Sequence, residues 1–233
     1  EKTPGGWTII RGDGAEGRHE HAAVLFAGTA HTLSELQLPF ELGLDLSPLA
    51  DIHYPPVASV VLGFRREDVA HPLDGFGVLI PQIEGFNILG TLFSSSLFPH
   101  RAPAGHVTLT TYIGGARNPE LAGLDTQSLV DLTCRDLQRL VGVKGKPTFQ
   151  HHVLVRKAIP QYNVGYGRFL KLMDEVEVRA PGVFLAGNYR NGISLSDSIV
   201  AGHDIAGRIE TFLASGPVKN VAAASKIPAA VHA

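Results

Sequence analysis

The sequence predicts an α/β protein, in which helices and buried strands form one part and a mixed or antiparallel sheet forms the other. The first observation is the run 183–199, where the apolar segment Val183–Ala186 indicates a buried strand, glycines indicate a turn, and a helix follows over about Ser196–Leu213. The second is Ala23–Phe26, a similar apolar segment followed by the small residues Ala27–Ala30, as expected of a strand leaving an open sheet. The third is a series of β-branched segments separated by turn residues in the middle of the chain.

The N-terminal elements follow from local signals. Trp7–Ile10 and Ala22–Phe26 are expected to form a hairpin around the glycine-rich turn Gly12–Gly14. A short helix is expected over Thr32–Leu36, with Thr32 as its N-cap and a glutamate three residues on.

The middle of the chain supplies the sheet and the clearest helix. That helix is expected over Asp125–Val141, because its leucines share one broad face, Asp125 can cap its start and Gly142 can end it. From Gly216 onward the residues are small and without pattern, which indicates a mobile tail over 216–233. The strands are expected at Ala58–Phe64, Gly75–Pro81, Asn87–Ser94, His106–Gly114 and Phe149–Val155.

Composition excludes several classes of protein. Hydrophobic residues make up 44% of the chain and charged residues 18%, which indicates a substantial core and argues against disorder. The formal net charge of −2 gives no sign of nucleic-acid binding. Cys134 is the single cysteine, so no intrachain disulfide is formed, and we interpret it as a packing residue in a reducing compartment. No apolar run reaches the roughly 18–20 residues of a membrane span, so we expect a cytoplasmic location, leaving open peripheral contact with the inner face of the plasma membrane.

Three motifs resemble one family of flavoproteins. The segment 185–199, Leu-Ala-Gly-Asn-Tyr-Arg-Asn-Gly-Ile-Ser-Leu-Ser-Asp-Ser-Ile, resembles the C-terminal flavin motif of the oxygen-dependent protoporphyrinogen oxidases, within the amine-oxidase-like superfamily. Ile159–Tyr162 resembles the Ile-Pro-Gln-Tyr segment that lies upstream of that motif. Gly75–Pro81, followed by Ile88–Leu92 and 95–99, resembles the central region of the family.

The resemblance implies an FAD-dependent oxidase of porphyrin and haem biosynthesis. It would dehydrogenate protoporphyrinogen or coproporphyrinogen, with dioxygen as the acceptor. The family opens with a strand, a Gly-x-Gly-x-x-Gly turn and a helix that hold the FAD pyrophosphate. No such strand, turn and helix segment occurs in this sequence, so the chain is expected to be the C-terminal part of a longer flavoprotein and to lack activity on its own. A homodimer is a further expectation.

The resemblance also implies the domains and the sites. Residues 1–30 and 156–215 would belong to a Rossmann-like FAD-binding domain, and residues 31–155 would form the substrate-binding domain. No catalytic residue is assigned, because the resemblance requires no strong protein base. The expected cofactor-binding residues are Gly187, Asn188, Gly192, Ile193, Ser194 and Leu195. The expected substrate-binding residues are Phe76, Gly77, Leu79, Leu92 and Tyr112.

Alternative interpretations remain open at this point. The chain fits another amine-oxidase-like FAD enzyme, such as a phytoene-desaturase-like or amine-oxidising relative, and it also fits a catalytically silent fragment. We reject metal sites at His19–His21 and at His151–His152, because two ligands without a third are weak evidence. Asp197 is interpreted as a helix cap, since no nucleophile elbow is present to make it part of a hydrolase triad.

Overall fold

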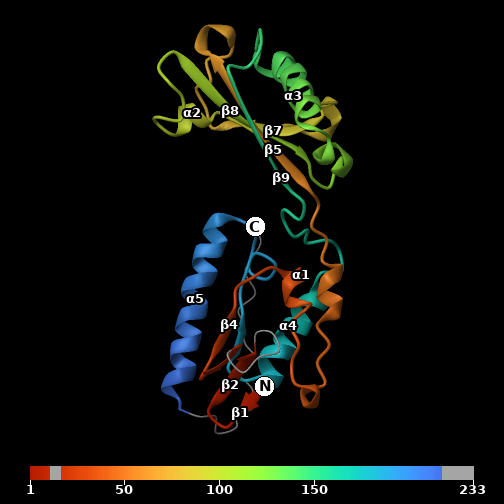
Figure 1. The fold of residues 1–233 in the computed structure, drawn as a ribbon, viewed down its shortest axis with the longest axis vertical. Helices are drawn as coiled ribbons and strands as arrows, with labels where there is room; N and C mark the ends of the chain where they lie inside the picture. The colour runs from red at the N-terminus through yellow and green to blue at the C-terminus, as the bar shows by residue number, and fades with distance from the viewer. Residues whose placement is uncertain (11–16, 217–233) are drawn as a thin grey trace. The chain divides into compact units, whose positions relative to one another are not determined.

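The chain folds into two compact units. The computed structural model describes residues 1–10 and 17–216. Unit 1 comprises Glu1–Ile52 and Tyr162–Ala233, and unit 2 is the intervening segment His53–Gln161 (Figure 1). Residues 31–52 therefore lie with unit 1, whereas the sequence placed them with the sheet. The two ends of unit 2 lie side by side, because the N–H of Gln161 donates to the carbonyl oxygen of His53 at 2.9 Å.

A parallel pair of strands forms the centre of unit 1. β4 (Val24–Phe26) pairs with β10 (Val183–Leu185), so that Val24 lies beside Val183 and Phe26 beside Leu185. Helix α5 (Leu195–Ala214) packs against this pair through Ile205, and the ring of Phe212 meets Phe184 edge-on at 5.6 Å. Helix α4 (Gly167–Arg179) also contacts β10. The two buried strands and the long helix expected at 23–26, 183–186 and 196–213 are all present, within a residue or two of the expected bounds.

The N-terminal hairpin has a different second strand from the expected one. β2 (Gly6–Ile10) pairs antiparallel with β3 (Arg18–His21), and β1 (Lys2–Thr3) adds to the other edge of β2. The expected partner Ala22–Phe26 was wrong, because its apolar residues enter the buried parallel pair while the exposed, polar residues of β3 complete the hairpin. The expected turn Gly12–Gly14 lies outside the described residues.

Short helical turns connect the strands of both units. The N-cap of α1 (Ala30–Leu33) is Thr29, three residues before the expected N-cap Thr32, and Thr32 closes the capping box from the N3 position. Apart from Gly216, the mobile tail expected over 216–233 lies outside the described residues. The remaining turns are Phe40–Leu42 and Ser47–Asp51 in unit 1, and Arg66–Asp68, Gln82–Glu84, α2 (Ser94–Leu97) and Pro119–Gly123 in unit 2.

Unit 2 is a five-stranded antiparallel sheet in the order β6-β7-β8-β5-β9. Helix α3 (Thr126–Val141) covers one face, where its Leu129 and Leu137 are fully buried against residues such as Leu62 and Leu109 (Figure 1). Helix α2 packs against part of the other face, where the hydroxyl of Ser94 lies 2.7 Å from that of Thr110. The strands are β5 (Val57–Arg65), β6 (Gly77–Leu79), β7 (Ile88–Leu92), β8 (His106–Gly114) and β9 (Phe149–Val155).

Asp125 and Gly142 define the two ends of α3, and the buried Asp136 fixes the position of the helix against the sheet. Asp125 caps the helix by accepting the N–H of Ser128 at 3.0 Å, and Gly142 ends it in the left-handed conformation with φ of 65°. The buried Asp136 carboxylate accepts the N–H groups of Asn87 and Ile88 at 2.7 and 3.1 Å, which ties the helix to the start of β7. Asp125–Gly142 therefore behaves as its sequence predicted.

Candidate flavin site

The candidate cofactor site is the glycine loop, residues 187–194, which joins β10 to the N-terminus of α5. It lies at the carboxyl end of the parallel pair, beside the turn through Gly28 that follows β4. The N–H of Ala186 donates to the carbonyl oxygen of Phe26 at 3.1 Å, which holds the two strand ends together. In open parallel sheets, ligands bind at this end of the strands. The loop carries five of the six residues expected to contact the cofactor, and Leu195 directly follows it.

Two glycines give the loop its shape. Gly187 has φ of 154° and Gly192 has φ of 106°, conformations that residues with a Cβ rarely adopt. A Cβ on Gly187 would lie 2.5 Å from Cε1 of Tyr189, and a Cβ on Gly192 would lie 2.6 Å from Oδ2 of Asp197. Both positions therefore require glycine for conformational and for steric reasons.

The start of α5 is closed by a capping box. Ser194 is the N-cap, and its Oγ accepts the N–H of Asp197 at 3.0 Å. The carboxylate of Asp197 in turn accepts the N–H of Ser194 at 3.2 Å. Asp197 was expected to be the cap, but it lies at N3, because Ser194 already has the extended backbone that an N-cap needs.

The helix N-terminus offers hydrogen-bond donors more than net positive charge. The N–H groups of Leu195 and Ser196 have no acceptor within the helix, since they belong to its first turn. The partial positive charge of the terminus favours an anion, but the negative charge of Asp197 offsets part of it. Carbonyl oxygens on the edge of a ring system are therefore suitable partners for this terminus.

Exposed apolar side chains surround these donors. Leu195 is 78% exposed, Ile193 is 50% exposed, and Ile199 and Val200 on the next turn are also exposed. Asn188 is half-buried and supplies an amide in the same loop. Flat apolar surface beside N–H donors matches a flavin, whose ring system is apolar on its faces and polar on its edge. The donor set and the glycine positions thus fit the expected cofactor.

Tyr162 fastens the two ends of the loop to each other. Its hydroxyl donates to the carbonyl oxygen of Asn188 at 2.6 Å and accepts the N–H of Gly192 at 3.1 Å. Burial raises the pKa of this hydroxyl, so it stays protonated and able to donate. Tyr162 thus links the Ile159–Tyr162 motif to the glycine loop through direct hydrogen bonds.

Arg190 ties the loop to the rest of unit 1. Its guanidinium group forms ion pairs with Glu177 at 2.6 Å and with Asp174 at 2.8 Å, both on α4. Glu177 also pairs with Arg208 of α5 at 2.6 Å. Burial acts to raise the pKa of Glu177, but hydrogen bonds from Arg190, Arg208 and the N–H of Leu185 outweigh burial and hold it below its usual value. The sequence analysis did not single out these residues.

Acid is expected to weaken unit 1 through Glu177. Because the folded pKa lies below the usual value of about 4.3, the carboxylate stabilises the native state at pH above that value. This contribution is lost as the pH falls through the lowered folded pKa. The free energy of unfolding of wild type and Glu177→Gln, measured between about pH 7 and about pH 3, should differ at neutral pH and converge below about pH 4. A difference that stays constant over this range would contradict the assignment.

Three of the residues expected to bind substrate, Leu79, Leu92 and Tyr112, lie on the face of the sheet in unit 2 that α3 does not cover. Gly77 lies opposite Leu92, and Gly90 lies opposite both Leu79 and Tyr112. Cross-strand partners point to the same side of a sheet, so the side chains of Leu79, Leu92 and Tyr112 project together from the face that α3 does not cover. Leu79 is 87% exposed.

Phe76 and Gly77 lie at the margin of this face. Phe76 precedes β6, is 68% exposed, and its carbonyl oxygen accepts the N–H of Phe93 at 3.0 Å. A Cβ on Gly77 would lie 2.3 Å from the carbonyl oxygen of Thr91, so this glycine is required by the close approach of β7. We call the surface formed by Gly77, Leu79, Leu92 and Tyr112 the open face, and Phe76 lies at its edge.

Comparison with known proteins decides the family. A model described as flavin-containing amine oxidoreductase matches residues 4–209. The chain belongs to this family. Its cofactor is a flavin, in agreement with the expected FAD.

Proteins similar in sequence to this chain include porphyrinogen oxidases. Protoporphyrinogen oxidase 2, chloroplastic/mitochondrial, of Arabidopsis thaliana is 43% identical over 180 residues, which are 76% of this chain and 35% of the relative. Coproporphyrinogen III oxidase of Bacillus subtilis (strain 168) is 28% identical over 171 residues, covering 73% of this chain and 36% of the relative. The chain thus spans about a third of the length of these relatives. A structure of reduced UDP-galactopyranose mutase shares the fold, with a TM-score of 0.67, 13% identity and coverage of 90% of this chain and 45% of that one.

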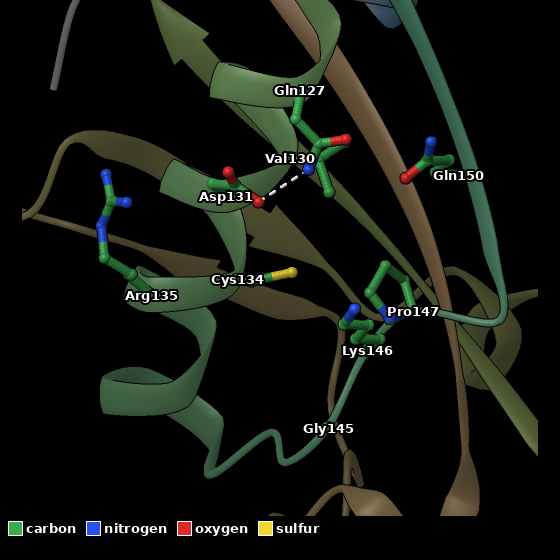
Figure 2. A pocket seen from close by; sticks show the side chains of 9 residues that line it. All are labelled: Gln127, Val130, Asp131, Cys134, Arg135, Gly145, Lys146, Pro147 and Gln150. Carbon is green, nitrogen blue, oxygen red and sulfur yellow. Dashed lines mark hydrogen bonds between the residues drawn. The ribbon is translucent and has the colours of Figure 1, made fainter.

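A separate hollow of about 550 Å³ lies in unit 2, between α3 and the segment that leads into β9 (Figure 2). The thiol of Cys134 and the side chains of Lys146 and Pro147 line it, and Gln127 donates to Asp131 at 2.8 Å on its rim. Burial, and secondarily Asp131, raise the pKa of Cys134, so the thiol stays protonated at neutral pH and is a weak nucleophile. The hollow contains none of the expected site residues.

Neither a cluster of metal ligands nor a membrane-spanning helix occurs in the part of the chain that the structure describes. Within residues 1–10 and 17–216, no group of three or more His, Cys, Asp or Glu side chains could hold a metal ion. Among the same residues, no helix has the length and apolarity to cross a bilayer.

Proposed function

We propose that this chain is the C-terminal part of an FAD-dependent oxidase that dehydrogenates a porphyrinogen to the porphyrin, with dioxygen as the electron acceptor. The observation that carries the proposal is the 43% identity to a protoporphyrinogen oxidase over 76% of the chain. The glycine loop supports it, because its geometry fits the flavin of the family. Both protoporphyrinogen and coproporphyrinogen remain candidate substrates, since relatives named for each are similar to this chain.

Unit 1 would contribute to flavin binding. The backbone N–H groups at the start of α5 would donate to the polar edge of the ring system, and Ile193 and Leu195 would contact its apolar surface. The bound flavin would accept reducing equivalents from the macrocycle and pass them to dioxygen. The residues of this chain would bind and orient the reactants, and none is assigned as a base.

Unit 2 would contribute to substrate binding. The macrocycle is large and apolar with carboxylates at its rim. The exposed side chains of Phe76 and Leu79, beside the half-buried Leu92 and Tyr112, suit its ring. The carboxylates need cations, and the guanidinium group of Arg117 already donates to the carbonyl oxygen of Ile80 at 2.9 Å. Arg117 and Lys157 are the candidates for this role within the chain.

A substrate comparison tests the proposed function. The purified full-length protein should carry flavin and consume oxygen with porphyrinogens but not with primary amines. A full-length protein that carries flavin but turns over only amines would favour another amine-oxidase-like activity. A full-length protein without flavin would favour the alternative that this chain is catalytically silent. Homodimerisation and contact with the plasma membrane stay predictions.

The isolated chain is expected to bind FAD weakly. It supplies the loop and the start of α5, but its Gly-x-Gly-x-x-Gly run at 12–17 is followed by strand β3 and not by the helix that would hold the pyrophosphate. Calorimetric titration of residues 1–233 with FAD should give a dissociation constant well above the micromolar range, and the full-length protein is the positive control. Micromolar or tighter binding by the chain alone would show that the missing contacts contribute little.

A further inference from the structure

We propose that Arg190 and Glu177 are positioning residues that set the conformation of the glycine loop for flavin binding. The inference rests on the proposed function of the loop and adds two residues to it. Neither residue belongs to the expected cofactor-binding set, and neither needs to touch the flavin to act.

Arg190 points from the loop into unit 1. Its side chain is only 7% exposed. Nη1 donates to Oε1 of Glu177 at 2.6 Å and Nη2 donates to Oε2 at 3.1 Å, a two-pronged geometry that a planar guanidinium group matches and an ammonium group does not. Nη1 also donates to the carbonyl oxygen of Leu185 at 2.8 Å, at the end of β10. Arg190 is thereby held on both the strand before the loop and the helix beside it.

Glu177 joins the three elements that frame the site. Its carboxylate accepts the N–H of Leu185 at 2.9 Å, the guanidinium group of Arg190 in the loop, and Nη2 of Arg208 in α5 at 2.6 Å. Its side chain is 11% exposed. A carboxylate with this many charged and backbone partners fixes the end of β10, the loop and the helix relative to one another.

The charges in this cluster are balanced, and its central pair, Arg190 and Glu177, is shielded from solvent, with 7% and 11% of the side chains exposed. Two carboxylates, Asp174 and Glu177, face two guanidinium groups, Arg190 and Arg208. Removing one buried member leaves its partner uncompensated, whereas removing an exposed ion pair changes little. Arg179 and Glu175 form such an exposed pair on the same helix, at 2.8 Å with 44% and 51% of their side chains exposed. They provide the matched control.

The bonds of Arg190 also constrain the neighbouring loop residues that would contact the flavin. Arg190 lies two residues after Asn188 and two before Gly192. The same two residues are bridged on the other side by the hydroxyl of Tyr162. Loss of the Arg190 anchor leaves the Tyr162 bridge and the bond from the hydroxyl of Tyr166 to the carbonyl oxygen of Tyr189. The two ends of the loop would keep their separation, but the loop would lose its fixed position relative to β10 and α4.

The test compares variants of the full-length protein by flavin affinity, flavin absorption spectrum and thermal unfolding. Arg190→Met should weaken FAD binding at least 10-fold and shift the visible spectrum of the bound flavin. Arg190→Lys should fall between wild type and Arg190→Met, because lysine restores the charge but not the two-pronged bond. Arg179→Met should match wild type in all three measurements.

A double variant separates positioning from stability. Arg190→Met combined with Glu177→Met removes both buried charges and leaves unpaired only charges that are about half exposed, those of Asp174 and Arg208. Its melting temperature should therefore recover towards wild type while its FAD affinity stays low. Recovery of flavin affinity along with stability would overturn the inference, as would wild-type affinity and spectrum in Arg190→Met. A wild-type full-length protein without flavin would instead refute the proposed function, so the two failures are distinguishable.

Discussion

Replacement of Gly192 by valine in the full-length protein is expected to abolish flavin binding while leaving most of the fold intact. A side chain at φ of 106° is strained, and its Cβ would lie 2.6 Å from the carboxylate of Asp197. Relief of this clash must move either the loop or the capping box that opens α5. Both movements displace the N–H groups assigned to the flavin, so the protein should purify without yellow colour.

Gly202→Ala is the control for this substitution. Gly202 lies in the same helix, and a Cβ there meets nothing within 4 Å. Alanine at this position should keep the flavin and stabilise the helix by about 0.5–1 kcal/mol. Full flavin content and normal turnover in Gly192→Val would show that residues 187–195 do not form the cofactor site.

Replacement of Phe76 by alanine should have the opposite pattern, with flavin kept and porphyrinogen turnover reduced. Phe76 is 68% exposed in unit 2 and contributes little to the core, so its truncation should leave the melting temperature almost unchanged. If the ring packs on the macrocycle, its loss removes about 1.5–3 kcal/mol of apolar contact, or roughly 10- to 100-fold in kcat/KM.

Phe98→Ala is the matched control for Phe76. Phe98 is 55% exposed in the same unit and follows α2, outside the strands that carry the open face. Its truncation should leave kcat/KM unchanged. Equal turnover by Phe76→Ala and wild type, or an equal loss in both variants, would remove Phe76 from the substrate site.

Regular elements with strong local signals could be predicted from the sequence. Helix α3 has a capping Asp125, an apolar face and a terminal Gly142, and all three act as expected. Strands β8 and β9 have the expected bounds, since turn residues delimit them. The strand, glycine turn and helix over 183–213 were also predictable, and they contain the candidate site.

Features that depend on distant partners could not be predicted. Helix α4 was missed, because it begins without a side-chain cap and buries only Phe169, Met173 and Val176. The spacing of these three residues was the signal that could have revealed it. Arg190 could not be recognised as a buried residue from the sequence, because its partner Glu177 lies on the helix that was not predicted. Sequence patterns also could not decide whether Arg18–His21 or Ala22–Phe26 completes the hairpin, since both are extended.

Anaerobic reduction of the flavin is the measurement that tests the central claim most directly. The full-length protein, mixed with protoporphyrinogen or coproporphyrinogen in the absence of oxygen, should lose its oxidised flavin absorption as porphyrin absorption appears, and admission of dioxygen should restore the flavin. A flavin that stays oxidised with both porphyrinogens, or that only an amine reduces, would contradict the assignment of this chain to a porphyrinogen oxidase.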